Sequence, residues 1–281
     1  MSDTQRIFKS TSKGKIITTD AQIKELNNKK NRSVNNEKLL TWFVAKIMEY
    51  PKYKNRVFDY LFNKSIDNIN SFNIGFEVQP LSPRRGKDGN TEGNTHLDLA
   101  IGNITNRGKS GKIEGSGIKY NNIGPNMVCF IEAKMYSDLS TGVTHDKSRN
   151  QLTRVIENLL CFQDDNNKFP DDICFTLLTP RAFQLEPKAK LYGYKYLEFL
   201  DDLSRGGELI KSEINKLQIP KRYDTKWDYP ILDERLKKLR LNWATYEDIF
   251  EMVLKSNTSL DLLKLKNPND FLDSLNIKII Q

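Results

Sequence analysis

Residues 127–135 read MVCFIEAKM, and this short segment constrains the fold more than any other part of the chain. It is apolar almost without a break until Glu132, a pattern typical of a central strand that is covered on both faces. Successive side chains of a strand point to opposite faces, so Glu132 and Lys134 share one face and Ala133 points to the other. One end of a buried strand therefore presents an anion beside a cation, which is costly unless the charges pair or bind a metal ion.

Three more short segments predict strands, at residues 73–80, 95–102 and 172–180. The second of these, THLDLAIG, alternates with a period of two residues. Leu97, Leu99 and Ile101 are therefore expected on one face of the strand and Asp98 on the other. Acidic side chains are thus expected on two strands of the same sheet.

Amphipathic helices are predicted between and around the strands. EKLLTWFVAKIMEY, which begins at Glu37, and residues 148–162 both carry apolar side chains at helical spacing. The second of these helices connects two buried strands, which predicts a right-handed parallel unit. The chain after about residue 188 is mostly helical, with Thr245 and Asp248 spaced as a capping box.

The order of these elements predicts an α/β fold, in which a mixed β-sheet core is flanked by helices and followed by a mostly helical C-terminal portion. We expect a flexible polar N-terminal arm at 1–34, a core at 35–185, and a helical extension at 186–281 packed on that core. Within the core, residues 102–126 are rich in Gly, Asn, Lys and Ser and predict a long basic loop or a flexible hairpin.

The composition excludes several classes of protein. The chain has 281 residues, 38% of them hydrophobic, which is enough for a buried core and excludes intrinsic disorder. It has no apolar stretch long enough to span a membrane and no signal sequence, so a cytoplasmic protein is expected. Cys129, Cys161 and Cys174 lack metal-site spacing and are expected to be reduced core residues. The only histidines, His96 and His145, give no support for a Ser-His-Asp or HExxH site.

Two carboxylates and a backbone carbonyl make an oxygen site that suits Mg²⁺, which keeps several water ligands and accepts phosphate oxygens. Asp98, Glu132 and the carbonyl of Ala133 are the candidate ligands. Lys134 would orient or activate the attacking water, or stabilise the charge that develops on phosphorus. The chemistry that follows is hydrolysis of a phosphodiester bond.

These residues resemble the PD-(D/E)XK nuclease superfamily, through Asp98 in THLDLA and Glu132-Ala133-Lys134 in VCFIEAKM. The resemblance implies a restriction-endonuclease-like core over roughly residues 37–180, a Mg²⁺ ion for which Mn²⁺ can substitute, and the roles proposed above. It also implies that Glu37, on the first helix, helps to hold the metal, and that Gln151, on the helix after the lysine strand, is a further site residue. Residues 102–126 would then be an insertion at the tip of a hairpin.

Simpler roles are open for each of these residues. Asp98 could cap a turn, and Glu132 with Lys134 could form only an ion pair at the end of a buried strand. Glu37 could simply favour a helix N-terminus through the helix dipole. Gln151 could complete a capping box that begins at Ser148, three residues earlier.

A net charge of +8 favours an anionic partner, and six basic residues are candidate nucleic-acid contacts. They are Arg84, Arg85, Arg107, Lys109, Lys112 and Arg154. The function expected from the resemblance is a Mg²⁺-dependent DNA endonuclease of the restriction or defence type, with RNA left open as a substrate and a homodimer as a possible partner arrangement. The alternative is a DNA- or nucleotide-binding module that kept the fold without the activity.

Overall fold

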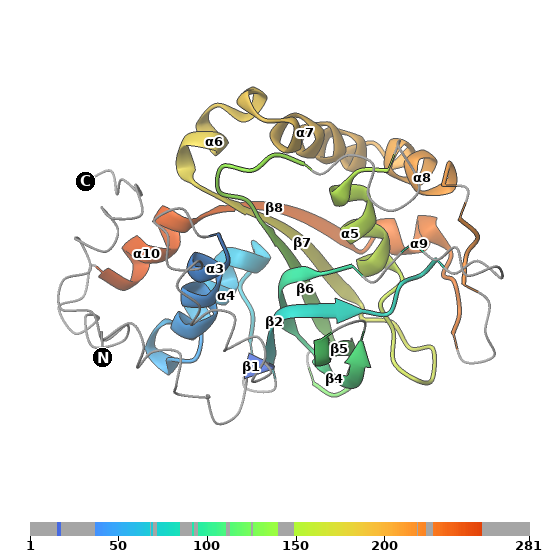
Figure 1. The fold of residues 1–281 in the computed structure, drawn as a ribbon, viewed down its shortest axis with the longest axis horizontal. Helices are drawn as coiled ribbons and strands as arrows, with labels where there is room; N and C mark the ends of the chain where they lie inside the picture. The colour runs from blue at the N-terminus through green and yellow to red at the C-terminus, as the bar shows by residue number, and fades with distance from the viewer. Residues whose placement is uncertain are drawn as a thin grey trace.

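The computed structural model describes residues 16–17, 37–67, 69, 72–84, 92, 95–110, 113–124, 126–139, 149–217, 219–222 and 227–254. These residues form a mixed β-sheet with helices on both faces, which confirms the α/β class (Figure 1). In the described part of the chain, no helix is both long enough and apolar enough to cross a membrane.

The sheet has the strand order β4-β5-β2-β3-β6-β7-β8, with β1 paired to β2. β3 runs antiparallel to both β2 and β6, whereas β6, β7 and β8 are parallel to one another. The strands are β1 (Ile16–Ile17), β2 (Asn73–Pro80), β3 (Leu97–Gly102), β4 (Ile104–Ser110), β5 (Ile113–Tyr120), β6 (Met127–Ala133), β7 (Asp172–Thr179) and β8 (Leu239–Thr245). The four strands predicted from the sequence are confirmed, and so is the parallel pairing of β6 with β7.

Helices cover the two faces of the sheet in two groups (Figure 1). The first group is α3 (Glu37–Ile47), α4 (Pro51–Phe62) and α10 (Tyr246–Leu254). The second is α5 (Gln151–Leu160), α7 (Leu191–Ser204), α8 (Glu208–Asn215) and α9 (Leu232–Leu236), with α6 (Arg181–Leu185) and a short 3₁₀ turn (Pro187–Ala189) leading into it. The helices predicted from Glu37 and over 148–162 correspond to α3 and α5.

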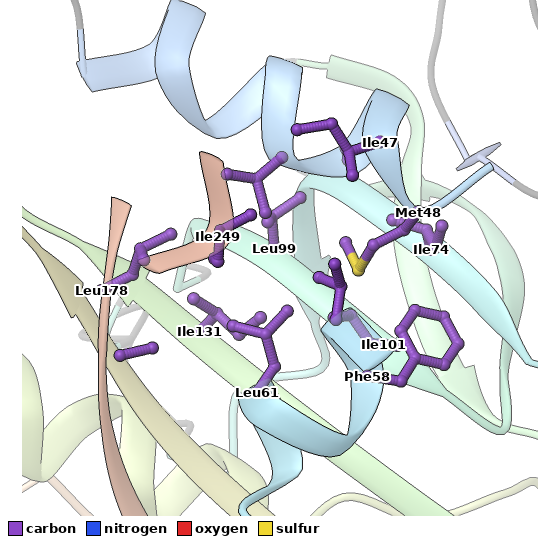
Figure 2. Close-up of a cluster of buried hydrophobic side chains, with 14 of the residues drawn as sticks. Ile47, Met48, Phe58, Leu61, Ile74, Leu99, Ile101, Ile131, Leu178 and Ile249 are labelled. Carbon is purple, nitrogen blue, oxygen red and sulfur yellow. The ribbon is translucent and has the colours of Figure 1, made fainter. Parts of the chain in front are cut away.

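Each group of helices packs its apolar stripe on one face of the sheet. Figure 2 shows the first interface, where Leu99, Ile131 and Leu178 of neighbouring strands face Leu61 of α4 and Ile249 of α10. All five side chains are fully buried, and burial of this kind supplies most of the stabilisation of such a layered fold. The three cysteines are free and buried, which confirms their prediction as reduced core residues.

Residues 102–126 contain a two-stranded hairpin, which was one of the two predicted alternatives, and not a long loop. β4 and β5 form an antiparallel hairpin with register shifts near Gly108, and β5 joins the sheet alongside β2. Ile118 and Tyr120 are buried, whereas most of the hairpin is polar because it lies at the edge of the sheet. A polar edge hairpin needs few apolar residues, so its composition resembles that of a loop.

The C-terminal portion contributes a strand that its sequence did not suggest. β8 pairs in parallel with β7 over its whole length, so this portion completes the sheet as well as covering it with helices. Thr245 caps α10, because its hydroxyl accepts the Asp248 N–H at 3.1 Å, which confirms the capping role. Of the expected arm at 1–34, only β1 is described, and there the chain pairs with β2. The last 27 residues of the extension lie outside the described part.

One detail of β2 and β3 shapes the candidate site. Leu97 packs with the cluster around α5, whereas Leu99 packs with the cluster around α3 and α4, so the two do not share a face as predicted. The alternation changes at Asp98, and directly opposite, Glu77 of β2 has a left-handed backbone with φ of +51°. A left-handed residue turns its strand locally, which accounts for the change of face.

Candidate metal and catalytic site

The predicted acidic and basic residues converge where β6 ends and β3 begins. The first residue of α3, Glu37, and the first residue of α5, Gln151, reach the same place. The antiparallel register pairs Leu99 with Ile131, so the residues just beyond this pair, Asp98 and Glu132, lie opposite each other. The structure therefore brings together residues that are far apart in the sequence.

Glu132 lies at the centre of this cluster, with only 1% of its surface exposed. Its Oε1 atom lies 3.0 Å from the Lys134 ammonium and also accepts a hydrogen bond from the Gln151 amide. Its Oε2 atom is buried and has no hydrogen-bond partner among the described residues. A buried carboxylate oxygen without a partner is costly, so this atom is where a bound cation would gain most.

The side chain of Asp98 links β3 to β6 just beyond the last backbone pair of these two strands, Leu99 with Ile131. Its Oδ2 atom accepts the backbone N–H of Ala133 at 2.7 Å. The N–H and C=O groups of one strand residue point to the same side, so the Ala133 carbonyl is expected on the Asp98 side as well. The oxygen donors predicted for Mg²⁺, which are the carboxylates of Asp98 and Glu132 and this carbonyl, therefore lie on neighbouring positions of two strands.

Glu37 joins the site through the loop that follows β6. Its Oε2 atom accepts the Met135 N–H at 2.7 Å and the Ser137 hydroxyl at 3.2 Å. These bonds hold the first turn of α3 against the end of β6. Glu37 therefore both begins a helix, where a negative charge is favourable, and faces the cluster from the expected helix.

Gln151 does not complete a capping box. Asn150 caps α5 instead, because its Oδ1 atom accepts the Thr153 N–H at 2.9 Å. The Gln151 amide instead donates to Glu132, which places this side chain at the candidate site. Ser148, the other half of the alternative capping box, lies outside the described residues.

Burial and the charges of neighbouring side chains shift the pKa values of the ionisable groups in the cluster. Burial is the main reason that the pKa of Glu132 rises to about 7, although the nearby Lys134 opposes this shift. Burial and then the charges of Glu132, Glu77 and Glu37 raise the pKa of Asp98 well above its ordinary value. Burial would lower the pKa of Lys134, but the carboxylates around it, Glu132 first, outweigh burial and raise it. Excess negative charge in a partly dry site is what a divalent cation would relieve.

Arg84 is not available to a nucleic acid, which corrects the prediction for this residue. Only 3% of its surface is exposed, and its guanidinium donates to Glu157 at 2.7 Å and to the carbonyls of Ile219 and Ile214. A buried arginine of this kind holds α5 and the segment after α8 together.

The other candidate phosphate contacts are placed in different surroundings. Arg154 is buried on α5, with its Nε atom 3.7 Å from Glu92, so it too is not available to a nucleic acid, which corrects its prediction. Arg107 is half-buried on β4, at a cavity of about 650 Å³ that Trp227 also lines. Lys109 lies on β4. Arg85 and Lys112 lie outside the described residues. Of the described candidates, Arg154 interacts electrostatically with Glu132 as well as with Glu92.

Glu77 was missed by the sequence analysis. It lies opposite Asp98, and its Oε2 atom is 2.9 Å from the Lys38 ammonium of α3. The only indication in the sequence was one acidic residue within the strand NIGFEVQP, and no recognisable motif surrounds that residue.

The described residues contain no group of three or more His, Cys, Asp or Glu side chains arranged to hold a metal ion directly. The fit to Mg²⁺ rests on Asp98, Glu132 and a backbone carbonyl, with the remaining positions filled by water, as this ion prefers. The bare Oε2 atom of Glu132 is the feature of the structure that agrees with such an ion.

Searches of protein-family models, curated proteins and solved structures found no match to the chain.

Proposed function

We propose that this protein is a Mg²⁺-dependent nuclease that hydrolyses phosphodiester bonds, and that it is a DNA endonuclease of the restriction or defence type. The observation that carries the proposal is the arrangement around Glu132. One carboxylate oxygen is held by Lys134 and Gln151, while the other is buried and has no hydrogen-bond partner among the described residues. A structural ion pair alone would not require a second carboxylate, that of the half-buried Asp98, at the opposite position of the neighbouring strand.

The order of elements supports the same proposal. After β1 come α3 with Glu37 and a second helix, α4, and then the strand β2, the strand β3 with Asp98, the hairpin of β4 and β5, the strand β6 with Glu132, the helix α5 with Gln151 and the parallel strand β7. This order and this mixed sheet agree with a restriction-endonuclease-like core. In this interpretation the hairpin of β4 and β5 is an insertion between the two acidic strands, and β8 is an addition at the far edge.

Each residue has a definite task in the proposed reaction. Asp98, Glu132 and the Ala133 carbonyl would hold the ion, which supplies charge stabilisation at phosphorus and lowers the pKa of a water molecule. Lys134 is held as an ammonium group by the carboxylates around it, so it acts as a hydrogen-bond donor rather than as a base. It orients the attacking water or stabilises the negative charge of the transition state. Gln151 keeps the Glu132 carboxylate in place.

A cleavage assay tests the proposal. The purified protein is incubated with supercoiled, linear and single-stranded DNA and with RNA, in Mg²⁺, in Mn²⁺ and in EDTA. We expect nicking or degradation of DNA with either metal and none in EDTA. Asp98→Asn and Lys134→Met should each lower the rate by about 1,000-fold, because each removes a group that stabilises developing charge.

Matched controls separate loss of chemistry from loss of folding. Asp202→Asn removes a buried carboxylate that only accepts backbone N–H groups, and Lys46→Met removes a buried ammonium that pairs with Glu49. Both controls should keep the activity. DNA binding without cleavage in any divalent ion would favour a catalytically silent binding module instead. Equal cleavage by the control and site variants would disprove the site.

A further inference from the structure

We propose that Glu77 is a further carboxylate of this site, a positioning residue that binds the water ligands of the divalent cation. The inference rests on the function proposed above and assigns a role to a residue outside the motif of Asp98, Glu132 and Lys134. It concerns the strand on the far side of Asp98 from Glu132.

The register places Glu77 at the cluster. β2 and β3 pair Phe76 with Leu99 and Val78 with Leu97, so Glu77 lies directly opposite Asp98. Asp98 in turn lies opposite Glu132 on the next strand. Three acidic residues therefore occupy the same level of three adjacent strands. At this level the left-handed backbone of Glu77 interrupts the regular alternation of both β2 and β3.

The charges of the cluster point to a divalent cation. Four carboxylates lie at this level of the sheet, from Glu37, Glu77, Asp98 and Glu132, and the cations near them are Lys38, Lys134 and Arg154. The carboxylates outnumber these cations, and the raised pKa values of Asp98 and Glu132 reflect the cost of holding negative charges close together in a buried place, which a divalent cation would relieve.

The independent sign of a ligand is the Oε2 atom of Glu132, because it is buried, lacks a hydrogen-bond partner among the described residues and belongs to a side chain that is 99% buried. The Glu132 carboxylate lies within electrostatic range of both Glu77 and Glu37. Burial and Lys134 have the largest effects on the pKa of Glu132, and the charges of Glu37 and Glu77 raise it further.

The contact of Glu77 is through water rather than direct. Direct contact would need three acidic side chains grouped closely enough to hold an ion, and the described residues contain no such group. Mg²⁺ and Mn²⁺ retain water ligands when few protein oxygens are available, and a carboxylate that accepts hydrogen bonds from such waters strengthens metal binding. Lys38, 2.9 Å away, holds the Glu77 carboxylate from the α3 side.

Titration of the full-length protein with Mn²⁺ alone, followed by calorimetry, tests this role without relying on activity. Outer carboxylates of metal sites commonly contribute 10- to 100-fold to affinity, so Glu77→Gln should weaken Mn²⁺ binding by that factor. Glu49→Gln is the matched control, because Glu49 is also a partly exposed carboxylate paired with a lysine of α3. It should bind Mn²⁺ as the unmodified protein does.

Glu77→Asn guards against a failure to fold, since asparagine tolerates the left-handed backbone better than glutamine does. It should weaken Mn²⁺ binding as Glu77→Gln does. Affinity within twofold of the unmodified protein in the folded variants, with clear loss in Glu132→Gln, would overturn the role of Glu77 and leave the metal site standing. Unchanged affinity in Glu132→Gln and Asp98→Asn as well would overturn the proposed function itself.

Discussion

The buried Glu132 carboxylate should make the metal-free protein less stable as the pH rises. Its pKa is about 7 in the folded protein and 4.5 as the ordinary value. Between these values the folded state binds more protons than the unfolded state, so the free energy of unfolding falls as the pH increases. With about 1.4 kcal/mol for each pH unit of difference, this one group lowers the free energy of unfolding by about 2–3 kcal/mol between pH 5 and pH 8.

Urea unfolding in EDTA at pH 5 and pH 8 measures this loss. The glutamine of Glu132→Gln cannot ionise, so the free energy of unfolding of this variant should fall by about 2–3 kcal/mol less over the same range. Asp98, whose pKa is also raised by burial and by Glu132, acts in the same direction in both proteins. Lys134 stays charged throughout this pH range, because its pKa is raised, and so it does not contribute.

Addition of 10 mM Mg²⁺ should restore much of the lost stability at pH 8 and little at pH 5, because the ion binds the ionised carboxylates. In Glu132→Gln, the effect of Mg²⁺ should be small at both values. The reasoning is refuted if the two proteins lose the same stability from pH 5 to pH 8, or if Mg²⁺ stabilises both equally.

Three further substitutions test the structure around the site. Arg84→Ala removes one of the partners of the buried Glu157 carboxylate, which keeps Arg149 and Tyr229, and leaves two buried carbonyls without their donor. It should cost about 3 kcal/mol in urea unfolding, whereas the exposed control Arg205→Ala should change stability by less than about 0.5 kcal/mol. Similar values for the two would show that the buried arginine contributes nothing. Gly102 has φ of +121°, and an added Cβ would lie 2.2 Å from the Met127 carbonyl oxygen, so Gly102→Ala should lower the melting temperature strongly. An unchanged melting curve would contradict this close approach of the end of β3 to β6. Thr245→Ala should lower the free energy of unfolding by about 1 kcal/mol, because the cap of α10 is lost. Thr245→Ser keeps the hydroxyl and should therefore keep most of the stability, which thermal unfolding can measure. Equal losses in both would rule out the cap.

Local periodicity was sufficient to predict most of the core. The apolar run at 127–135 became the central strand β6, and the helical stripe of 148–162 became α5, which crosses from β6 to the parallel strand β7. Alternation and helical spacing are properties of neighbouring residues, so they can be recognised without any knowledge of the fold. Asp98, Glu132 and Lys134 were identified from the strand patterns around them, and Glu37 and Gln151 from the resemblance to the nuclease superfamily; the structure brings all five to one place.

The remaining features depend on partners that are distant in the sequence. β5 and β8 are strands because each has an existing strand to pair with, in β2 and β7, and their composition alone does not require it. Arg84 looked like a surface residue until the fold placed Glu157 beside it, 73 residues further along the chain. The turning of β2 at Glu77 could be recognised only from the register with β3.

The sequence by itself determined which side chains could perform chemistry and on which kind of element each one lies, because residue type and local spacing carry that information. Only the tertiary structure decided which charges are buried, which of them pair, and that one oxygen of Glu132 lacks a hydrogen-bond partner among the described residues. Burial and pairing are set by long-range packing, and the cost of a charge depends on what surrounds it rather than on its neighbours along the chain.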